Sequence, residues 1–334
     1  MQFDQLKRRE FITLLGGAAA AWPLAARAQQ PGMRRIGVLI AGLETDPEMR
    51  AWVQAFQRAL ERLGWHDGRN AMVEIRWGSG GVERLRSSAS ELIALAPAVI
   101  LSTSNEATTL LSGQTNRIPI VFASVGDPLE TGLITNMVRP GGNVTGFVSR
   151  EAALAGKFLE LLKEAAASLT RVAVLYNRDS RIHPRYIDVV RAAAPSLGIQ
   201  AIIPVPVNDP AEIERDIDAF SHEANGGLIV LTGPPTRVNR DTIIGLAEHH
   251  RLPAIYSDKT FVTEGGLMSY GADLIEQFRL SASYVDRILR GEEPGDLPVQ
   301  APTKFELVIN SKAANAIRLA VPPVLLARAD EVIE

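Results

Sequence analysis

Short polar side chains follow an apolar run near residue 100, which is typical of a buried strand. Ser102, Thr103, Ser104 and Asn105 come directly after that run, and a helix is expected from residue 106 to 111. A Ser or Thr cap offers hydroxyls and free backbone N–H groups to an anion, and the helix dipole favours negative charge there. We therefore predict these four residues as ligands of a carboxylate, although ordinary helix capping would use the same residue types.

A second polar group follows the next apolar run, which ends near residue 123. Ser124 supplies a hydroxyl and Asp127 a carboxylate within the segment Ser-Val-Gly-Asp-Pro. We predict that both side chains contribute to the same site. Asp127 could instead hold the turn before Pro128, which is a common role for Asp.

The second half of the chain carries polar groups of both signs at comparable places. The predicted binding residues there are Tyr176, Asn177, Asp179, Thr232, Tyr256 and Asp258. Asp179 or Asp258 could accept an ammonium group and Arg178 a carboxylate, whereas Arg178 and Lys259 fit solvated loops slightly better. Together these types suit a zwitterionic or carboxylated solute with a flat or apolar body.

Catalytic motifs are missing from the sequence. It has no GxSxG elbow, no GxxxxGK[ST] phosphate loop, no GxGxxG after the first apolar run and no HExxH pair. The five histidines are scattered, and a chain without cysteine has no thiolate metal site, disulfide or cysteine nucleophile. Cofactor-independent amino-acid racemases need two cysteines. We therefore expect a binding protein with no cofactor, no metal and no catalytic residue.

An internal repeat organises these groups. Arg35-Ile-Gly-Val-Leu-Ile40 recurs as Arg171-Val-Ala-Val-Leu-Tyr176, and Arg117-Ile-Pro-Ile-Val-Phe122 recurs as Arg251-Leu-Pro-Ala-Ile-Tyr256. The run beginning at Val99 recurs at Ile229, so the three offsets are 136, 134 and 130 residues in the same order. Similar offsets in the same order indicate a duplicated unit.

Each copy alternates strands and helices. The strands are continuous apolar runs, as in parallel sheets that are buried on both faces. A helix is expected from the Asp46 cap to Gly64, a strand over 73–77 and a helix over 82–95. The pattern predicts an α/β fold of two doubly wound parallel-sheet lobes joined by a hinge. Ligands bind beyond the carboxyl ends of such strands, so the polar groups above should face one cleft.

The N-terminus reads as a secretion signal. Arg8-Arg9 precedes a short apolar run, and Ala26-Arg27-Ala28 supplies the small residues that a signal peptidase reads. We predict a twin-arginine-type signal over 1–28, cut after Ala28, with a retained membrane anchor as the alternative. Removing it leaves 31 basic and 36 acidic residues, and this negative balance disfavours a nucleic-acid partner.

From Ile36 to Glu334 the chain resembles the substrate-binding proteins of ABC transporters, in the group related to binders of tryptophan and other aromatic amino acids. The resemblance is carried by Ile118-Pro-Ile-Val-Phe122, Gly126-Asp127-Pro128, Arg139-Pro-Gly-Gly-Asn-Val-Thr-Gly146, Gly265-Gly-Leu-Met-Ser-Tyr-Gly271, Tyr284-Val-Asp-Arg-Ile-Leu-Arg-Gly291, Asp296-Leu-Pro-Val299, Pro302-Thr-Lys-Phe-Glu-Leu-Val-Ile-Asn310 and Arg328-Ala-Asp-Glu331. Relatives tend to carry an acidic residue where this chain has Thr232-Gly-Pro-Pro235. An amino acid, an aromatic or aliphatic carboxylate and another neutral polar solute therefore all remain candidates.

The resemblance also implies a type I periplasmic binding fold with three crossings between lobes, near 146–148, 270–272 and 300–303. Lobe 1 would comprise 34–146 and about 272–300, and lobe 2 would comprise 147–271 and about 301–334. It implies a monomeric periplasmic receptor that closes over a small-molecule solute and delivers it to an ABC permease. A sensory receptor for a chemosensory or two-component system is the alternative, and an exported hydrolase or isomerase is a more distant one.

Overall fold

A five-stranded parallel sheet forms the centre of the first lobe. The computed structural model describes residues 32–78, 81–150, 152–207 and 209–334. The sheet has the order β2-β1-β3-β4-β5. Its strands are β1 (Arg34–Ile40), β2 (Ala71–Trp77), β3 (Val99–Thr103), β4 (Ile120–Gly126) and β5 (Val144–Arg150). Every neighbouring pair is parallel, so all the carboxyl ends lie at one edge.

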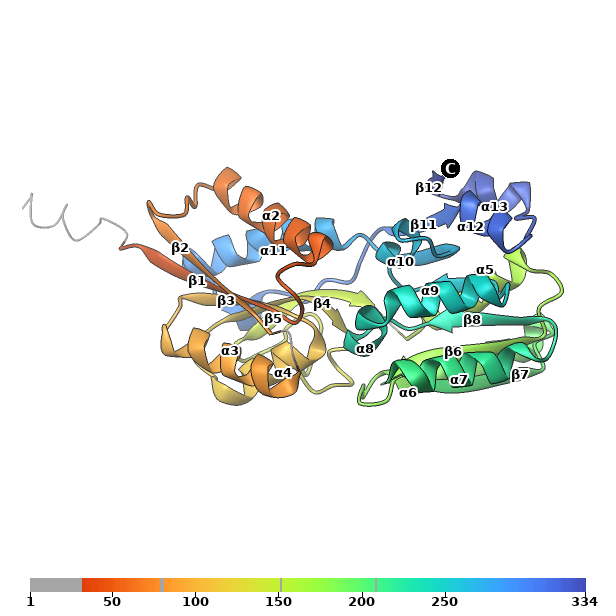
Figure 1. The fold of residues 1–334 in the computed structure, drawn as a ribbon. Coiled ribbons are helices and arrows are strands. Elements are labelled where there is room, and N and C mark those ends of the chain that lie inside the picture. The colour runs from red at the N-terminus through yellow and green to blue at the C-terminus, as the bar shows by residue number, and fades with distance from the viewer. Residues whose placement is uncertain (1–31, 79–80, 151, 208) are drawn as a thin grey trace, which may run out of the picture.

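Helices cover both faces of this sheet. They are α2 (Pro47–Arg62), α3 (Val82–Ala94), α4 (Asn105–Gln114) and α11 (Leu274–Leu289). The first of them begins where the sequence predicts, because the Asp46 carboxylate accepts the N–H groups of Glu48 and Met49. α2 and α11 pack on one face and α3 and α4 on the other, with a separate apolar core beneath each pair (Figure 1).

The second lobe repeats this plan and extends it. Its strands are β6 (Arg171–Asn177), β7 (Ala201–Val207), β8 (Gly226–Val230), β9 (Ala254–Tyr256), β10 (Met268–Ala272), β11 (Phe305–Asn310) and β12 (Glu331–Ile333). Its helices are α5 (Leu154–Ala165), α6 (His183–Ala193), η1 (Ala194–Leu197), α7 (Pro210–Ser221), α8 (Pro234–Val238), α9 (Arg240–His249), α10 (Lys259–Thr263), α12 (Ser311–Ala316) and α13 (Pro323–Arg328). Within the order β12-β11-β10-β9-β8-β6-β7, the last five strands match the first sheet one for one. The predicted fold class is confirmed.

The strand registers correct one detail of the internal alignment. Gly37 pairs with Ile100 in the first sheet, and its counterpart Ala173 pairs with Leu228 in the second. The run that begins at Val99 and its copy in the second lobe are therefore offset by 128 residues, not 130. Ser104 consequently corresponds to Thr232.

α11 belongs to the first lobe although it comes late in the sequence. The Phe278 ring stacks on Trp52 of α2 at 5.3 Å between ring centroids. The Gln277 side-chain amide donates to the Val148 carbonyl at 2.7 Å, and the Tyr284 hydroxyl donates to the Pro298 carbonyl at 2.6 Å. These contacts join α11 to α2, to β5 and to the segment that follows the short η2 helix (Pro294–Asp296).

The chain passes between the two sheets three times. β5 still pairs with β4 at Arg150, so the first crossing follows that residue and not residues 146–148. The second lies between β10 and α11, and the third between Gln300, which bridges to Phe147, and β11. Because the chain re-enters the second lobe from the cleft side, β11 runs antiparallel to β10. The exact division into lobes stays a prediction.

The remaining N-terminal expectations lie outside the described part of the chain. The secretion signal predicted over residues 1–28 falls before residue 32, where the description begins. Among the described residues, no helix combines the length and apolarity needed to cross a lipid bilayer.

Gly146 gives a test of how closely β4 and β5 pack. Its φ is 152°, and a Cβ added there would lie 2.1 Å from the Phe122 carbonyl oxygen and 2.6 Å from the Phe122 nitrogen. Neither backbone atom can move without breaking the β4–β5 pairing. Gly146→Ala should therefore lower the free energy of unfolding by about 2 to 4 kcal/mol, measured by urea denaturation.

Gly113→Ala is the matched control. Gly113 lies in α4 with no atom within 4 Å of an added Cβ, so this change should be neutral or slightly stabilising. Equal stability of the two variants would show that the β4–β5 contact is looser than described.

Candidate functional site

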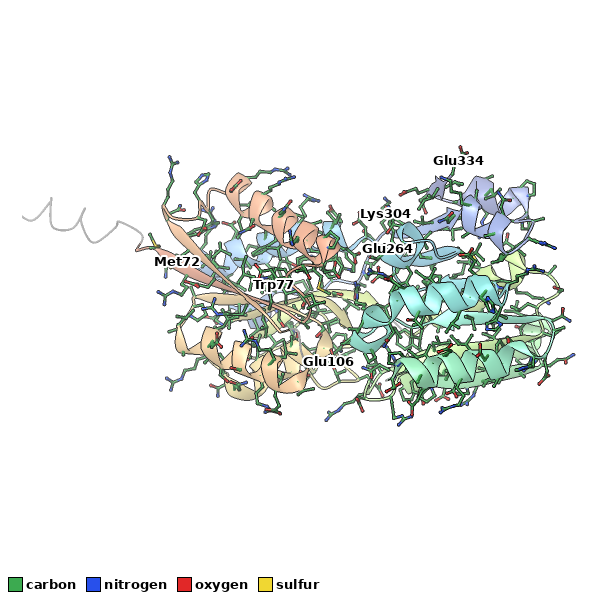
Figure 2. The ribbon with its side chains drawn as sticks, viewed as in Figure 1. Met72, Trp77, Glu106, Glu264, Lys304 and Glu334 are labelled. Atoms are coloured by element: carbon green, nitrogen blue, oxygen red, sulfur yellow. The ribbon has the colours of Figure 1, made fainter. Side chains whose placement is uncertain are left out.

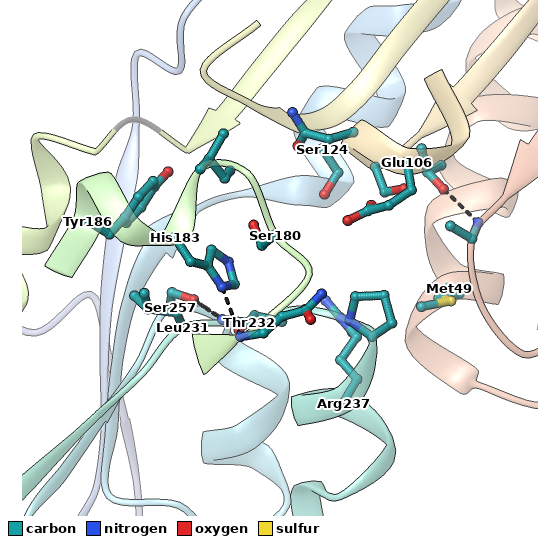
Figure 3. A pocket seen from close by; sticks show the side chains of 18 of the residues that line it. Met49, Glu106, Ser124, Ser180, His183, Tyr186, Leu231, Thr232, Arg237 and Ser257 are labelled. Atoms are coloured by element: carbon teal, nitrogen blue, oxygen red, sulfur yellow. Dashed lines mark hydrogen bonds between the residues drawn. The ribbon is translucent and has the colours of Figure 1, made fainter. Parts of the chain in front are cut away.

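A pocket lies between the two lobes, where the carboxyl ends of both sheets meet. Its volume is about 60 Å³. The first lobe lines it with Ala41, Met49, Trp52, Thr103, Ser104, Asn105, Glu106 and Ser124. The second lobe lines it with Asn177, Ser180, Ile182, His183, Tyr186, Leu231, Thr232, Gly233, Pro234, Arg237 and Ser257. Figure 3 shows these side chains converging from both sides, and Figure 2 places Glu106 at the junction of the lobes.

The N-terminus of α4 forms the polar wall of the first lobe. Ser104 caps this ten-residue helix, and its hydroxyl accepts the Ala107 N–H at 3.2 Å. The Asn105 amide clamps the end of β4, donating to the Gly126 carbonyl at 2.6 Å and accepting the Gly126 N–H at 3.0 Å. The first N–H groups of a helix have no acceptor within the helix. The amides of Asn105 and Glu106 are therefore suited to an anion.

The backbone around this wall is strained. Ser104, Ser124 and Asp127 have φ values of 69°, 57° and 42°, which residues with a Cβ rarely adopt. Ser104 and Ser124 both line the pocket. Such conformations carry roughly 1–3 kcal/mol each and concentrate at functional sites, because the surrounding structure must hold them. The strain supports a binding role for this edge of the sheet.

Hydroxyl, amide and imidazole groups form the wall of the second lobe. The Asn177 N–H donates to His183 Nδ1 at 3.0 Å. Since Nδ1 accepts, the ring is the neutral tautomer with its hydrogen on Nε2. The Ser257 hydroxyl accepts the Thr232 N–H and donates to the Thr232 hydroxyl, each at 2.9 Å. These bonds fix the loops that follow β6 and β8.

A buried group of three charges closes one side of the pocket. Arg237 Nη1 lies 3.0 Å from Glu48 Oε2, and Arg237 Nη2 is paired with Asp258 Oδ2. The guanidinium also lies over the Trp52 ring, 5.2 Å from its centroid. Asp258 Oδ1 accepts the N–H and the hydroxyl of Thr260, each at 3.0 Å. Glu48 and Trp52 belong to α2, so Arg237 holds the two lobes together.

Burial and like charge shift the titration of this group. Burial and, after it, the nearby Asp258 carboxylate raise the pKa of Glu48 to about 7 against the opposing effect of Arg237. Burial alone would lower the pKa of Arg237, but Asp258 and Glu48 outweigh it and raise that pKa. Arg237 therefore stays charged, and Glu48 is the member of the group that can titrate near neutral pH.

Six of the twelve predicted site residues line the pocket, and six do not. Those that line it are Thr103, Ser104, Asn105, Ser124, Asn177 and Thr232. Three others lie in a turn, at the surface or against the core. Asp127 holds a turn in which its carbonyl accepts the Thr131 N–H, Asp179 is exposed, and Tyr176 packs partly buried against the core of the second lobe.

The other three are buried and do not line this pocket. Ser102 is fully buried and shares a 3.0 Å hydrogen bond with Thr108. Tyr256 is 1% exposed and stacks on Phe261 at 4.8 Å, so its ring belongs to the core of the second lobe. Burial raises the pKa of its hydroxyl. Asp258 is paired with Arg237 and accepts two hydrogen bonds from Thr260, so its carboxylate already has partners within the protein.

Most of the other residues that line the pocket were not predicted as ligands. Those that matter most for its chemistry are Trp52, Glu106, His183 and Arg237, together with Glu48 of the buried charge group. Trp52 is 3% exposed and belongs to the core of the first lobe, although one side of the ring also meets the pocket. Arg237 returns to the cleft because α8 is only five residues long and follows β8 closely. Among the described residues, no three metal-ligating side chains gather in one place.

Asn105 provides a test of how the anion wall is held. Asn105→Ala leaves the Gly126 N–H and carbonyl without their partner, so it should lower the free energy of unfolding by about 1 to 3 kcal/mol in chemical denaturation. Ser112→Ala on the same helix is the control, because the Ser112 hydroxyl makes only an exposed local bond. If the two variants unfold alike, the clamp does not stabilise the wall.

Comparison with known proteins gives the chain its family. A curated tyrosine-binding protein from Clostridioides difficile is 24% identical over 298 residues, covering 87% of this chain and 84% of that protein. A conserved domain protein from Vibrio cholerae matches with a TM-score of 0.82 at 24% identity, covering 90% of this chain and 99% of its own. An ABC domain from Streptococcus pneumoniae in complex with L-Trp matches with a TM-score of 0.82 at 22% identity, covering 90% and 100%. The family model described as "ABC transporter substrate binding protein" matches residues 36–333, so the chain belongs to that family.

Proposed function

We propose that this protein is an exported receptor that captures an amino acid with an apolar, preferably aromatic, side chain and delivers it to an ABC importer. The observation that carries the proposal is the interlobe pocket, in which an anion-binding helix start, one carboxylate and apolar side chains face the same space. The receptor needs no cofactor and performs no covalent chemistry.

The polar head of such a solute has complementary groups on the first lobe. The free N–H groups of Asn105 and Glu106 and the hydroxyls of Ser104 and Ser124 suit its carboxylate. Glu106 suits its ammonium, because it is the only acidic side chain among the described residues that line the pocket. This role replaces the one that we expected for Asp258.

The apolar body of the solute has neighbours on both lobes. Met49 and Trp52 lie on one side and Ile182, Tyr186 and Leu231 on the other. Aromatic and thioether groups suit an aromatic ring. The relatives agree in kind, since one is named a tyrosine-binding protein and another was solved with L-Trp.

Delivery of the solute would depend on opening and closing of the two lobes. The pocket of about 60 Å³ is well below the roughly 300–1,000 Å³ of typical ligand sites, so a solute can occupy this pocket only if the lobes part. Closure over the solute is a population shift whose free energy depends on contacts with both lobes. The closed, monomeric receptor would then present both lobes to the permease.

Glu106 tests the identity of the solute. Glu106→Gln removes the charge that would neutralise the ammonium, so it should weaken binding of L-tryptophan or L-tyrosine about 10- to 100-fold in isothermal titration calorimetry. Indole-3-propionate, which has the carboxylate and the ring but no ammonium, should lose no affinity in the same variant.

Glu83→Gln, an exposed change at the start of α3, is the control and should leave both affinities unchanged. Failure of the unaltered protein to bind either amino acid would contradict the proposed solute. An equal loss for indole-3-propionate would contradict the role of Glu106.

Export is tested at the N-terminus. Replacing Arg8 and Arg9 by lysine should leave the full-length chain in the cytoplasm, because the arginine pair is the feature that a twin-arginine translocase reads. Cell fractionation and immunoblotting measure this directly. Unchanged export of the double variant would point to a different route.

A further inference from the structure

A second and larger cavity lies between the two lobes. Its volume is about 540 Å³, against about 60 Å³ for the pocket described above. The first lobe lines it with the starts of α2 and α11, and the second lobe lines it with α10 and the end of β10. Figure 1 shows α10 facing the starts of these two helices across the junction of the lobes. A molecule in this cavity would therefore contact both lobes.

Arg237 and Glu48 separate the larger cavity from the smaller pocket. Arg237 lines the pocket, Glu48 lines the larger cavity, and their side chains meet at 3.0 Å. Trp52 and Ser257 are the two described residues that both linings share. The Trp52 ring is itself held by contacts with Arg237 and Phe278. A molecule in the larger cavity would therefore lie beside the proposed solute and not in its place.

Two buried hydroxyl groups line the larger cavity, one from each lobe. Ser269 of β10 is 1% exposed, and its hydroxyl has no hydrogen-bond partner within the part of the chain that the structure describes. Ser149 of β5 is also 1% exposed, and its hydroxyl makes one long bond, 3.4 Å to the Val125 carbonyl. Buried polar groups are nearly always hydrogen-bonded to protein, to water or to a ligand. Both hydroxyls are therefore available to a polar molecule in the cavity.

The charged side chains of this lining already have partners within the protein. The partnerships are Glu48–Arg237, Asp258–Arg237, Glu264–Arg240, Glu306–Lys304, Lys259–Glu331 and, at the start of α11, Asp273 with the Glu276 N–H. An ionic ligand would compete with these partners for the same charges. An uncharged ligand would leave them in place, so the lining favours a neutral molecule.

The size and the remaining groups of the cavity narrow the class of ligand further. About 540 Å³ lies within the roughly 300–1,000 Å³ of typical small-molecule sites. Ser149 and Ser269 offer hydroxyls, and Leu274 and Ile275 offer apolar surface beside them. We propose that this cavity is a second binding site, which takes a small uncharged polyol about the size of a monosaccharide.

Occupancy of the second site should favour closure of the receptor. A ligand that contacts both lobes binds the closed form better than the open one, so it shifts the population toward closure. By linkage, the polyol and the solute then raise each other's affinity by the same factor. The inference rests on the proposed function only in this coupling, since the polyol site itself requires no particular solute.

Ligand-detected saturation-transfer NMR tests the site with D-glucose, D-sorbitol and ribitol as probes. Each probe is titrated into the mature protein at pH 6.5 without solute. D-glucosamine and D-glucuronate serve as charged comparisons of the same size as D-glucose. At least one polyol should bind at millimolar concentrations, and D-glucose should bind more tightly than either charged analogue. Absence of binding by all three polyols, or tighter binding of a charged analogue, overturns the proposal.

Three variants locate the bound polyol. Ile275→Trp fills the cavity from the second residue of α11, which is 50% exposed, and should weaken binding at least about tenfold. Val324→Trp is the matched control, because Val324 is the second residue of α13, is 67% exposed and lines neither cavity. Ser269→Ala removes one hydrogen bond and should weaken binding about three- to tenfold. Unchanged affinity in Ile275→Trp, or an equal loss in Val324→Trp, also overturns the proposal.

L-tryptophan distinguishes the second site from the first. At saturation it should tighten polyol binding about fivefold, because both ligands favour the closed form. Displacement of the polyol overturns the separation of the two sites, and an unchanged affinity overturns their coupling. If L-tryptophan does not bind, the proposed solute is wrong, and the polyol titrations of the variants still decide whether the second site exists.

Discussion

Both sheets are buried on both faces by helices, and this constraint determines where polar chemistry can occur. The interior of each sheet is apolar, as β1 and β3 show with their nearly continuous burial. Within each sheet, polar side chains therefore reach solvent mainly at the strand ends and in the loops that follow them. All parallel strands end at the same edge, so these loops gather at one place on each lobe. The pocket forms where these two edges meet, and its walls are the loops that already follow the strands.

The sequence predicts this frame well because it depends on periodicity and repetition. The duplicated strands, the Asp46 cap and the assignment of α11 to the first lobe all follow from local patterns or from the family resemblance. Individual side chains are harder to place because strand register decides which of them turn inward. Ser102 and Ser104 differ by two positions, yet one bonds within the core and the other lines the pocket.

Tyr256 illustrates the same limit from the other lobe. Its place at the end of β9 suggested an aromatic wall, but the ring lies over Phe261 of α10 in the interior. Its hydroxyl has no hydrogen-bond partner among the described residues, which shows that packing and not polarity determines its position. Arg237 is the converse case. Nothing in its local sequence marks it as an interlobe residue, because its partners lie 189 and 21 residues away and come together only through the fold.

The buried charges have a cost that stability alone does not explain. Removing charged groups from water usually offsets most of the attraction between them, so a buried ion pair is a poor source of net stability. Its geometry is nevertheless specific, since Arg237 can meet Glu48 and Trp52 only when the lobes adopt one relative position. Such a contact adds little to the stability of either lobe and discriminates strongly between the open and closed forms. For the receptor proposed above, a closed state held by such a marginal interaction allows closure without making it permanent.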